Sequence, residues 1–463
     1  MENPRGGFRQ KSISDIGKTG WERIGSPSPD SPVDARPGGF DFRRTLFQVS
    51  SLLISLGLLI LGNGLQTTLL GVRAGIEGIP PETVGLMMSA FFTGYLIGCR
   101  FIPKLVSQVG HVRAFAALTS LVSTIALLHA LFPNPWVWIV LRVLHGCFFA
   151  GLILIVESWL NGCTEKRYRG RVLAIYGIVY FAAWSASQLL LNLAPPSGFV
   201  LFCLVSILLS VALVPVTVSR AKVPGMTAAA KLSLKSLYRV SPLGMTGVLV
   251  SGLCMSAFFG MGPTFGQAIE LDHASLSVFM FATYFGGLTF QWPIGWLSDH
   301  IDRGAVIALS SLVNCLVCFG FVYIPAPAPE VLWVLSFLFG GFGIPVYSVC
   351  VAHTNDQLTR DALLAAASGL LFVYGLGSAV SPFAAGILMG NLGPEGLFLF
   401  AGIIQIPFIC FCAYRVLGRP PVVEKLRRSF VVLPRTTDAL LHLDKRHQPG
   451  AEPARKEMLG PKR

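Results

Sequence analysis

Charged side chains are scarce in this chain. Only 13% of its 463 residues are Asp, Glu, Lys or Arg, whereas 53% are apolar and 33 are Phe. A soluble globular protein of this length needs far more charge to cover its surface. The composition therefore excludes a soluble globular protein and predicts a protein of the lipid bilayer.

Charge is absent altogether from several long segments, among them 45–72, 240–269, 304–329 and 362–394. Each exceeds the roughly 20 residues with which a helix crosses a bilayer. The backbone of such a segment must satisfy its own hydrogen bonds, and the alternation typical of a barrel strand is absent, so the segments are helices. We predict twelve spans: 46–71, 82–101, 112–132, 136–159, 170–193, 197–218, 242–268, 274–297, 305–324, 330–352, 362–390 and 395–415.

The polar segments between and around the spans give the domain organisation. The first 44 residues are rich in Pro, Gly and Ser, which is typical of disorder. The first apolar segment begins too late and is too long for a cleaved signal peptide. We expect a disordered cytoplasmic N-tail (1–44), an N-terminal six-helix half (45–218), a basic cytoplasmic connector (219–241), a C-terminal half (242–415) and a basic cytoplasmic C-tail (416–463).

Basic residues are nearly absent from one set of loops. Of the 36 lysines and arginines, 34 fall in the tails and in alternate loops, which lie on one side of the membrane. The two exceptions are Arg73 and Arg142. This bias places both termini in the cytoplasm. The opposite loops are acidic and carry Glu77, Glu82, Glu270, Asp272, Glu330 and Glu395. Topology thus accounts for the net charge of +13, and no nucleic-acid partner is expected, because no folded domain carries a basic groove.

Motifs for catalysis are also absent. The sequence has no HExxH, no GxSxG, no paired aspartates within a span and no ATP-binding signature. Its ten cysteines lie mostly in spans, and the pair Cys315 and Cys318 has no nearby histidine or acid to complete a metal site. We expect that the protein is not an enzyme and needs no cofactor and no metal, and that any movement of solute across the bilayer would draw on ion or substrate gradients.

The chain repeats itself at an offset of about 192 to 198 residues. Gly62 falls over Gly260, Tyr176 falls over Tyr374, and PKLVSQVGHVR (103–113) falls over GWLSDHIDRG (295–304). Two six-helix halves in parallel repeat are typical of secondary transporters.

Two motifs carry a resemblance to a known family. GWLSDHIDRG resembles the loop signature G-x-L-x-D-R-x-G-R-R of the major facilitator superfamily, with Asp302 where glycine is usual. LRVLHG (141–146) resembles its fourth-helix signature R-x-x-x-G, and ESWLN, RGRVLAIY, QLLLNLA and AHTND are similar to the uncharacterised YcaD-like branch. The resemblance implies an all-α membrane protein with twelve transmembrane helices in two pseudo-symmetric six-helix halves, which transports a small molecule by alternating access.

The loop signature supplies candidate gating residues. Asp299 can face the N-terminus of a neighbouring helix and pair with an arginine, which would latch the two halves; an ordinary solvated loop is the alternative. The N-half copy has Pro103 and Ser107 in place of Gly295 and Asp299, so we expect an asymmetric gate. The gating candidates are Gly295, Asp299, Asp302, Arg303, Gly110, Arg113 and Asp356.

Polar side chains within the spans are the candidates for substrate binding. An arginine inside a span usually faces a cavity or a partner, although Arg142 could also extend to the outer interface. Asn63, Gln66 and Thr67 form a polar stripe on one helix face, which lines a cavity or bonds another helix. The substrate-cavity candidates are Asn63, Gln66, Arg142, His145, Gln188, Tyr284, Gln291, Tyr347 and Tyr374.

Three residues are candidates for proton coupling: Glu157, His145 and His353. Histidine titrates near neutral pH, and His145 either does so or packs as a neutral ring. Glu157 lies about 22 Å along the helix from Arg142, too far to pair with it, and either accepts a proton or anchors the following loop. No acidic cluster points to sodium.

The sequence therefore predicts a monomeric secondary transporter of a bacterial inner membrane, whose partners are a small-molecule substrate, protons and the lipid bilayer. Efflux by proton antiport is slightly favoured by LRVLHG, although span five lacks the glycine–proline signature of antiporters. Proton-coupled uptake of a metabolite is the alternative. A sensor or scaffold whose basic tails bind anionic lipid is a third reading.

Overall fold

The computed structural model describes residues 39–165, 168–218, 233–324, 328–358 and 360–417. Residues 43–463 form one compact unit and residues 1–42 another, of which only the start of α1 is described. The regular elements of these described ranges are all helices. They are α1 (Gly39–Ile76), α2 (Pro81–Val109), α3 (His111–Leu131), α4 (Pro135–Cys163), α5 (Arg169–Leu189), η2 (Leu190–Leu193), α6 (Val200–Val211), α7 (Leu213–Val218), α8 (Leu234–Val240), α9 (Pro242–Ala268), α10 (His273–His300), α11 (Arg303–Tyr323), α12 (Pro329–Asp356), α13 (Arg360–Leu392) and α14 (Gly396–Leu417).

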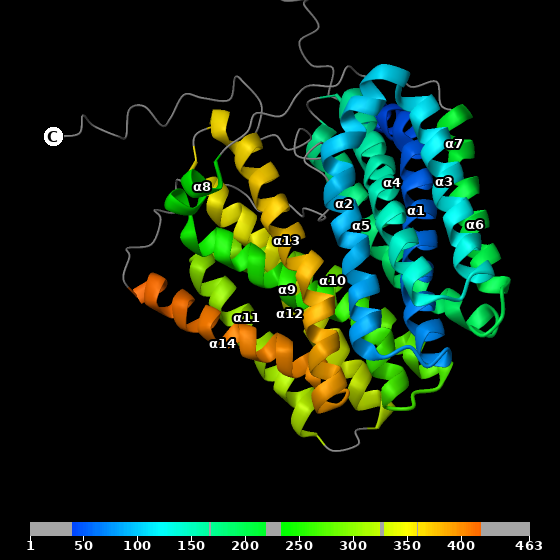
Figure 1. Cartoon of the computed structure of the whole chain (residues 1–463). Coiled ribbons are helices and arrows are strands. Elements are labelled where there is room, and N and C mark those ends of the chain that lie inside the picture. The colour runs from blue at the N-terminus through cyan, green and yellow to red at the C-terminus, as the bar shows by residue number, and fades with distance from the viewer. Residues whose placement is uncertain (1–38, 166–167, 219–232, 325–327, 359, 418–463) are drawn as a thin grey trace, which may run out of the picture. The chain divides into compact units, whose positions relative to one another are not determined.

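The helices confirm the predicted fold class (Figure 1). Among the described residues, eleven helical segments are long and apolar enough to cross a membrane. The remaining predicted span corresponds to α10, which has 28 residues but is not among the eleven. It carries the polar residues Thr283, Tyr284 and Gln291, and all three are buried. The polar side chains of α10 therefore face other parts of the protein.

Two elements differ from the prediction. The predicted sixth span, 197–218, is divided into α6 and α7 at Ala212. Pro215 explains the break, because it has no N–H to donate to the carbonyl of Val211 and its ring crowds that carbonyl. The short helix α8 lies within the predicted connector, and its buried Leu237 packs against Gly369 of α13.

Proline and short polar side chains fix where several helices begin. Asn134 caps α4 by accepting the backbone N–H of Trp136 at 2.9 Å, and Asp302 caps α11 by accepting that of Ala305 at 3.1 Å. Proline occupies a helix's first turn, where its missing N–H costs nothing, at positions 81, 135, 242 and 329.

The internal repeat is visible in how glycines bring helices together. In the N-terminal half the backbones of α2 and α4 touch where Gly94 meets the carbonyl of Val143 and Gly146 meets that of Phe91. In the C-terminal half α10 and α12 touch in the same way, Gly286 against Phe337 and Gly340 against Thr283. Equivalent glycines thus allow the same close contact between two helices in each half, as the repeat predicts.

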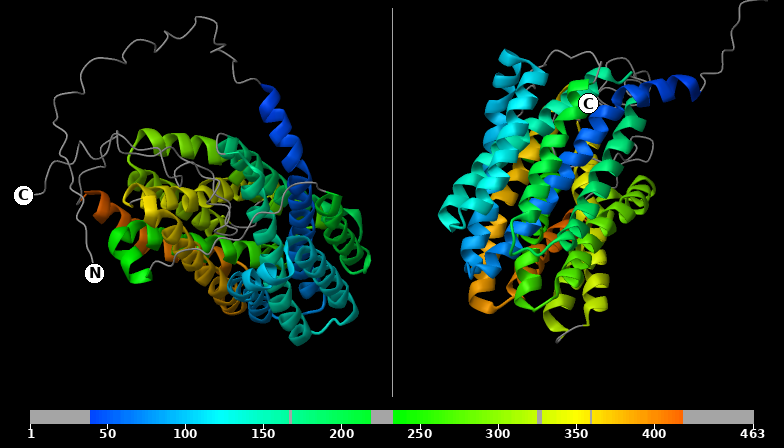
Figure 2. Two further views of the ribbon diagram at one scale, coloured as in Figure 1. Left: turned by 90° about the horizontal axis from the view of Figure 1, so that it is seen from above. Right: turned by 90° about the vertical axis from the view of Figure 1, so that its right-hand side faces the viewer.

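The two halves, α1–α7 and α8–α14, lie side by side (Figures 1 and 2) and contact each other through α2 with α13 and α9, and through α5 with α10. We call the end at which α14 finishes the tail end, and the opposite end the loop end. At the loop end the carbonyl of Pro382 packs on Gly85, and that of Pro81 packs on Gly386. Gln267 also donates to the Val72 carbonyl at 2.8 Å across the same interface. The halves are therefore packed closely together at the loop end.

Candidate functional site

A cavity of about 590 Å³ lies between the two halves. Its lining comes from α1, α2, α4 and α5 of the N-terminal half and from α8, α9, α10 and α13 of the C-terminal half. The lining continues towards the tail end through Cys99, Arg100, Leu234, Ala365 and Ser368. The volume falls within the roughly 300–1,000 Å³ of small-molecule sites. Since the halves are packed together at the loop end, the cavity is placed to receive a small molecule from the tail end.

Aromatic rings form much of the cavity wall, and three of them stack across the boundary between the halves. Tyr284 of α10 lies face to face with Phe259 of α9 at 4.8 Å between centroids, and with Trp184 of α5 at 5.0 Å. The interplanar angles are 12° and 14°. Further rings line the same space: Phe91, Phe92, Tyr95, Phe149, Tyr180, Phe181, Phe372 and Tyr374. The cavity therefore offers flat apolar surfaces as well as polar groups.

Arg142 is the most unusual polar side chain of this lining. It is 1% exposed, and its guanidinium lies over the ring of Phe91 at 4.4 Å from the centroid. Its Nη2 approaches the Met88 sulfur at 3.7 Å, while Nε and Nη1 have no hydrogen-bond partner among the described residues. The guanidinium thus remains inside the protein and does not extend to the outer interface.

Two histidines and a glutamine lie beside Arg142, inside the N-terminal bundle. His145, one turn further along α4, is fully buried, and its ring packs on Phe91 and Phe149 at 5.6 and 5.9 Å. Neither ring nitrogen of His145 has a hydrogen-bond partner in the described part of the chain. His129 of α3 lies near Gln66, with 3.5 Å between Nδ1 and Nε2. Arg142 and His129 are the other basic side chains of this buried cluster.

The predicted substrate-cavity residues separate into two groups. Asn63, Arg142, Tyr284 and Tyr374 line the cavity. The others lie behind it: Gln66 and His145 in the cluster just described, Gln188 as the acceptor of the Thr68 hydroxyl, Gln291 as a donor to Ser348 at 3.0 Å, and Tyr347 edge-to-face with Tyr374.

The proton-coupling candidates occupy different environments. Glu157 is fully buried near the tail end of α4 and accepts a hydrogen bond from the Tyr176 hydroxyl of α5 at 2.5 Å. His353 is partly buried on α12, with its Nε2 3.0 Å from the Gln357 side-chain nitrogen. His145 packs directly on two rings of the cavity wall, Phe91 and Phe149.

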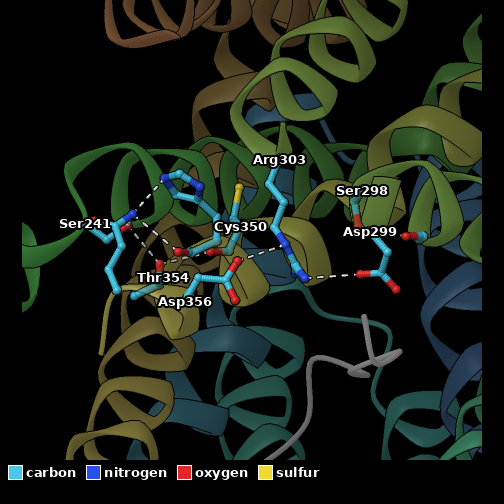
Figure 3. A network of polar contacts seen from close by, with 10 residues as sticks. Ser241, Ser298, Asp299, Arg303, Cys350, Thr354 and Asp356 are labelled. Atoms are coloured by element: carbon cyan, nitrogen blue, oxygen red, sulfur yellow. Dashed lines mark hydrogen bonds and ion pairs between the residues drawn. The ribbon is translucent and has the colours of Figure 1, made fainter. Parts of the chain in front are cut away.

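The gating candidates of the C-terminal half form an ionic network at its tail end (Figure 3). Arg303, 2% exposed, lies between Asp299 of α10 and Asp356 of α12, at 3.1 and 3.0 Å. Asp302 is the cap of α11, and Gly295 is buried on α10. These contacts join α10, α11 and α12 of one half.

The corresponding loop of the N-terminal half is built differently. Gly110 adopts a left-handed backbone conformation (φ 86°) that ends α2 and begins α3, which favours glycine there. His111 takes the sequence position of Arg303 and packs against Trp159, while Arg113 is exposed. Ser107 bonds only the local carbonyl of Lys104 among its described contacts.

Sequence reasoning missed most of the cavity wall. The rings of Phe91, Tyr180, Trp184 and Phe259 were not among the candidates, because 33 Phe and 10 Tyr are spread over all the spans. The available signal was the spacing of Tyr180 and Trp184 at i and i+4 in span five, which puts both rings on one helix face.

Fold and cavity together define a class: a multi-pass membrane protein built from two pseudo-symmetric helical halves around a central site, which is the architecture of a transporter. The sequence profile of the Major Facilitator Superfamily matches residues 52–373 and 270–449. The chain belongs to this superfamily, and its function is membrane transport of a small molecule.

Known relatives agree with the resemblance seen in the sequence. An uncharacterized MFS-type transporter of Enterobacter sp. (strain 638) is 27% identical over 77% of this chain and 92% of its own length. The uncharacterized MFS-type transporter YcaD of Escherichia fergusonii is 26% identical over 78% of this chain and 93% of its own. The predicted likeness to the YcaD-like branch is therefore confirmed.

Solved structures show the same fold at low identity. The nucleoside transporter NupG matches with a TM-score of 0.65 and 13% identity, over 80% of this chain and 98% of NupG. A bacterial homologue of the human lysosomal transporter Spinster, in an inward-facing and occupied conformation, matches with a TM-score of 0.64 and 13% identity, over 85% of this chain and all of the homologue.

Proposed function

We propose that this protein is a secondary active transporter of a bacterial inner membrane that moves a small molecule by alternating access, coupled to protons. The observation that carries the proposal is the cavity itself, which is lined by both halves and lies behind a closely packed loop end. Rocking of one half against the other about such a site exposes it to each side of the membrane in turn.

The membrane orientation follows from charge. The tails and the loops at the tail end hold nearly all lysines and arginines, so we place the tail end and both termini in the cytoplasm. In this orientation the described conformation receives substrate from the cytoplasm. The protein acts as a monomer, because each chain contains both halves of the cavity.

Proton coupling is proposed from the buried groups that can titrate. His145 lies behind the rings of Phe91 and Phe149, with Arg142 and His129 as the basic groups that face it. Glu157 is a carboxyl buried nearer the tail end, bonded to Tyr176. Export by proton antiport and uptake by proton symport use the same groups and the same inward proton gradient, and they differ in whether the substrate moves against the protons or with them.

The test is flux in proteoliposomes that contain the purified protein and a pH-sensitive dye, screened against a library of metabolites and drugs. We expect at least one compound to move protons, in a direction that distinguishes antiport from symport, and to do so only in protein-containing vesicles. A protein lacking residues 1–40 and 420–463 should keep its flux. A truncation that abolishes a cellular phenotype while native vesicles carry no compound would support a sensor or scaffold instead.

A further inference from the structure

The guanidinium of Arg142 lacks the partner that a buried charge requires. Its contacts among the described residues are a sulfur and an aromatic face, and its Nε and Nη1 have no described hydrogen-bond partner. A thioether and a ring satisfy a cation only weakly. A buried ion without a counter-charge is energetically unfavourable, so the site is incomplete as it stands.

Nothing in the described surroundings of Arg142 supplies the negative charge. No Asp or Glu lines the described part of the cavity, and its other charged group is Arg100. The titratable neighbours of Arg142 are His145 and His129, both neutral or positive. The cavity therefore has a positive potential around a fork of unused donors, which is the arrangement that binds a carboxylate or phosphate.

The rest of the lining indicates what is attached to that anion. Tyr284 and Trp184 present a stacked pair of ring faces from opposite halves, and Phe259 extends the stack. Stacked and edge contacts with a further ring favour a flat aromatic group over an aliphatic one. Asn63 adds a side-chain oxygen, Oδ1, that has no described partner and can accept one hydrogen bond from a ligand.

We propose that the substrate is a small aromatic anion, whose carboxylate or phosphate binds Arg142 and whose ring lies against the stack of Trp184, Tyr284 and Phe259. This inference rests on the transport function proposed above and narrows it to a substrate class. Both halves contribute to the site, since Arg142 and Trp184 belong to the first and Tyr284 and Phe259 to the second.

The first test varies the charge of a ligand on a constant ring. Purified full-length protein is titrated with indole-3-acetate, indole-3-acetamide and tryptamine, and binding is followed by thermal stabilisation. The anion should bind at least about tenfold more tightly than the amide, because a charge-assisted hydrogen bond replaces a neutral one. It should also bind more tightly than the amine, because the ammonium of the amine and the guanidinium of Arg142 repel each other. Equal or tighter binding of the amide or amine would overturn the proposal.

A second ligand pair tests the ring. Phenylacetate should bind about two- to tenfold more tightly than cyclohexylacetate, since only the former can stack. Comparing phenyl phosphate with phenylacetate shows whether a phosphate binds as well as a carboxylate. Comparing phenyl phosphate with inorganic phosphate shows whether the ring contributes to the binding of a phosphate. Equal affinity of the aromatic and saturated acids would remove the ring from the proposal.

Variants locate the effect. Arg142→Gln should bind the acid and the amide alike, and Arg142→Lys should keep part of the preference. Arg415→Gln is the matched control, because Arg415 also lies over a ring, Phe411 at 5.8 Å, but does not line the cavity. An undiminished preference for the acid in Arg142→Gln would overturn the assignment, and if this variant does not fold, the ligand series on the native protein decides alone.

Binding and flux separate the two proposals. Selective binding of the anion without flux of any compound would support this site and contradict the transport mechanism. Flux of neutral or cationic compounds, without selective binding of anions, would support the mechanism and contradict this substrate class.

Discussion

Two buried arginines of this protein have opposite surroundings. Arg303 is 2% exposed and has Asp356 at 3.0 Å, whereas Arg142 is 1% exposed and has no acid among its described neighbours. A buried charge with its counter-ion stabilises one arrangement of helices. A buried charge without one is a candidate for binding a ligand.

This contrast gives a prediction for the two aspartates that contact Arg303. Asp356→Asn should lower the free energy of unfolding by about 3–5 kcal/mol, because it weakens the buried ion pair. Asp299→Asn should change it by only about 0–1 kcal/mol, since the Asp299 side chain is 32% exposed. The melting temperatures of the two purified variants measure the difference.

The loop signature suggests a gating role for Asp299, although its described ion pair, with Arg303, lies within the C-terminal half and does not join the two halves. We predict that Asp299→Asn lowers the transport rate at unchanged expression and stability, through its proposed part in closing the tail end. Native transport rates in this variant would leave Asp299 as a solvated partner of Arg303.

Glu157 gives a prediction about proton coupling. Glu157→Gln retains an acceptor for the Tyr176 hydroxyl but cannot release a proton, so transport driven by a pH gradient should fall at least about tenfold, as for loss of a proton-transfer group. Exchange of labelled for unlabelled substrate at equal pH should persist. Tyr176→Phe is the control, because it removes the hydrogen bond and leaves the carboxyl of Glu157. Native gradient-driven flux in Glu157→Gln would show that Glu157 has a structural role and no role in proton coupling.

At the scale of elements, close helix pairs depend on glycines. A Cβ at position 146 would meet the carbonyl of Phe91, whereas one at position 57 would make only an ordinary contact with Val179, at 3.6 Å. Gly146→Ala should therefore lower the melting temperature and the yield of folded protein, at a cost of about 1–3 kcal/mol or more.

The controls for that change use the repeat. Gly57→Ala, within α1, should leave stability unchanged or raise it slightly, because alanine favours the helix. Gly340→Ala, at the position equivalent to Gly146, should be as damaging as Gly146→Ala. Equal stability of the variants at 57 and 146 would show that α2 and α4 do not need their close contact.

The elements were largely predictable because bilayer length and hydropathy set them. The exceptions have local causes, such as Pro215 in the sixth span and the short α8 in a polar segment. The site was less predictable. Asn63 and Gln66 share a polar stripe, yet Asn63 lines the cavity while Gln66 lies near His129. Asn63 and Gln66 are three residues apart, so their side chains point in directions that differ by about 300° around the helix axis. Only the packing of the neighbouring helices decides which of the two faces the cavity.

The contacts between the two halves could not be predicted from the sequence. Trp184 and Tyr284 are a hundred positions apart, and their stacking depends on how the two bundles meet. The repeat indicates which positions are equivalent in the two halves, but not which positions face each other across the boundary.

At the scale of the whole molecule, the central claim is that the two halves rock about the cavity. The loop end is held by contacts that a modest rotation can break, such as Gln267 with Val72, Ser277 with Asn192 at 3.2 Å and Phe383 with Ser89 at 3.0 Å. Opening there would part Trp184 from Tyr284 and expose the cavity to the other side.

The most direct measurement is a pair of spin-label distances in the full-length protein in lipid, after its native cysteines have been replaced. One pair is placed at the loop end, on exposed Glu77 and Ala274, and the other at the tail end, on exposed Val109 and Ile301. On lowering the pH or adding a transported compound, we predict a longer loop-end distance together with a shorter tail-end distance. Distances that stay fixed at both ends, or that change in the same direction at both, would contradict alternating access.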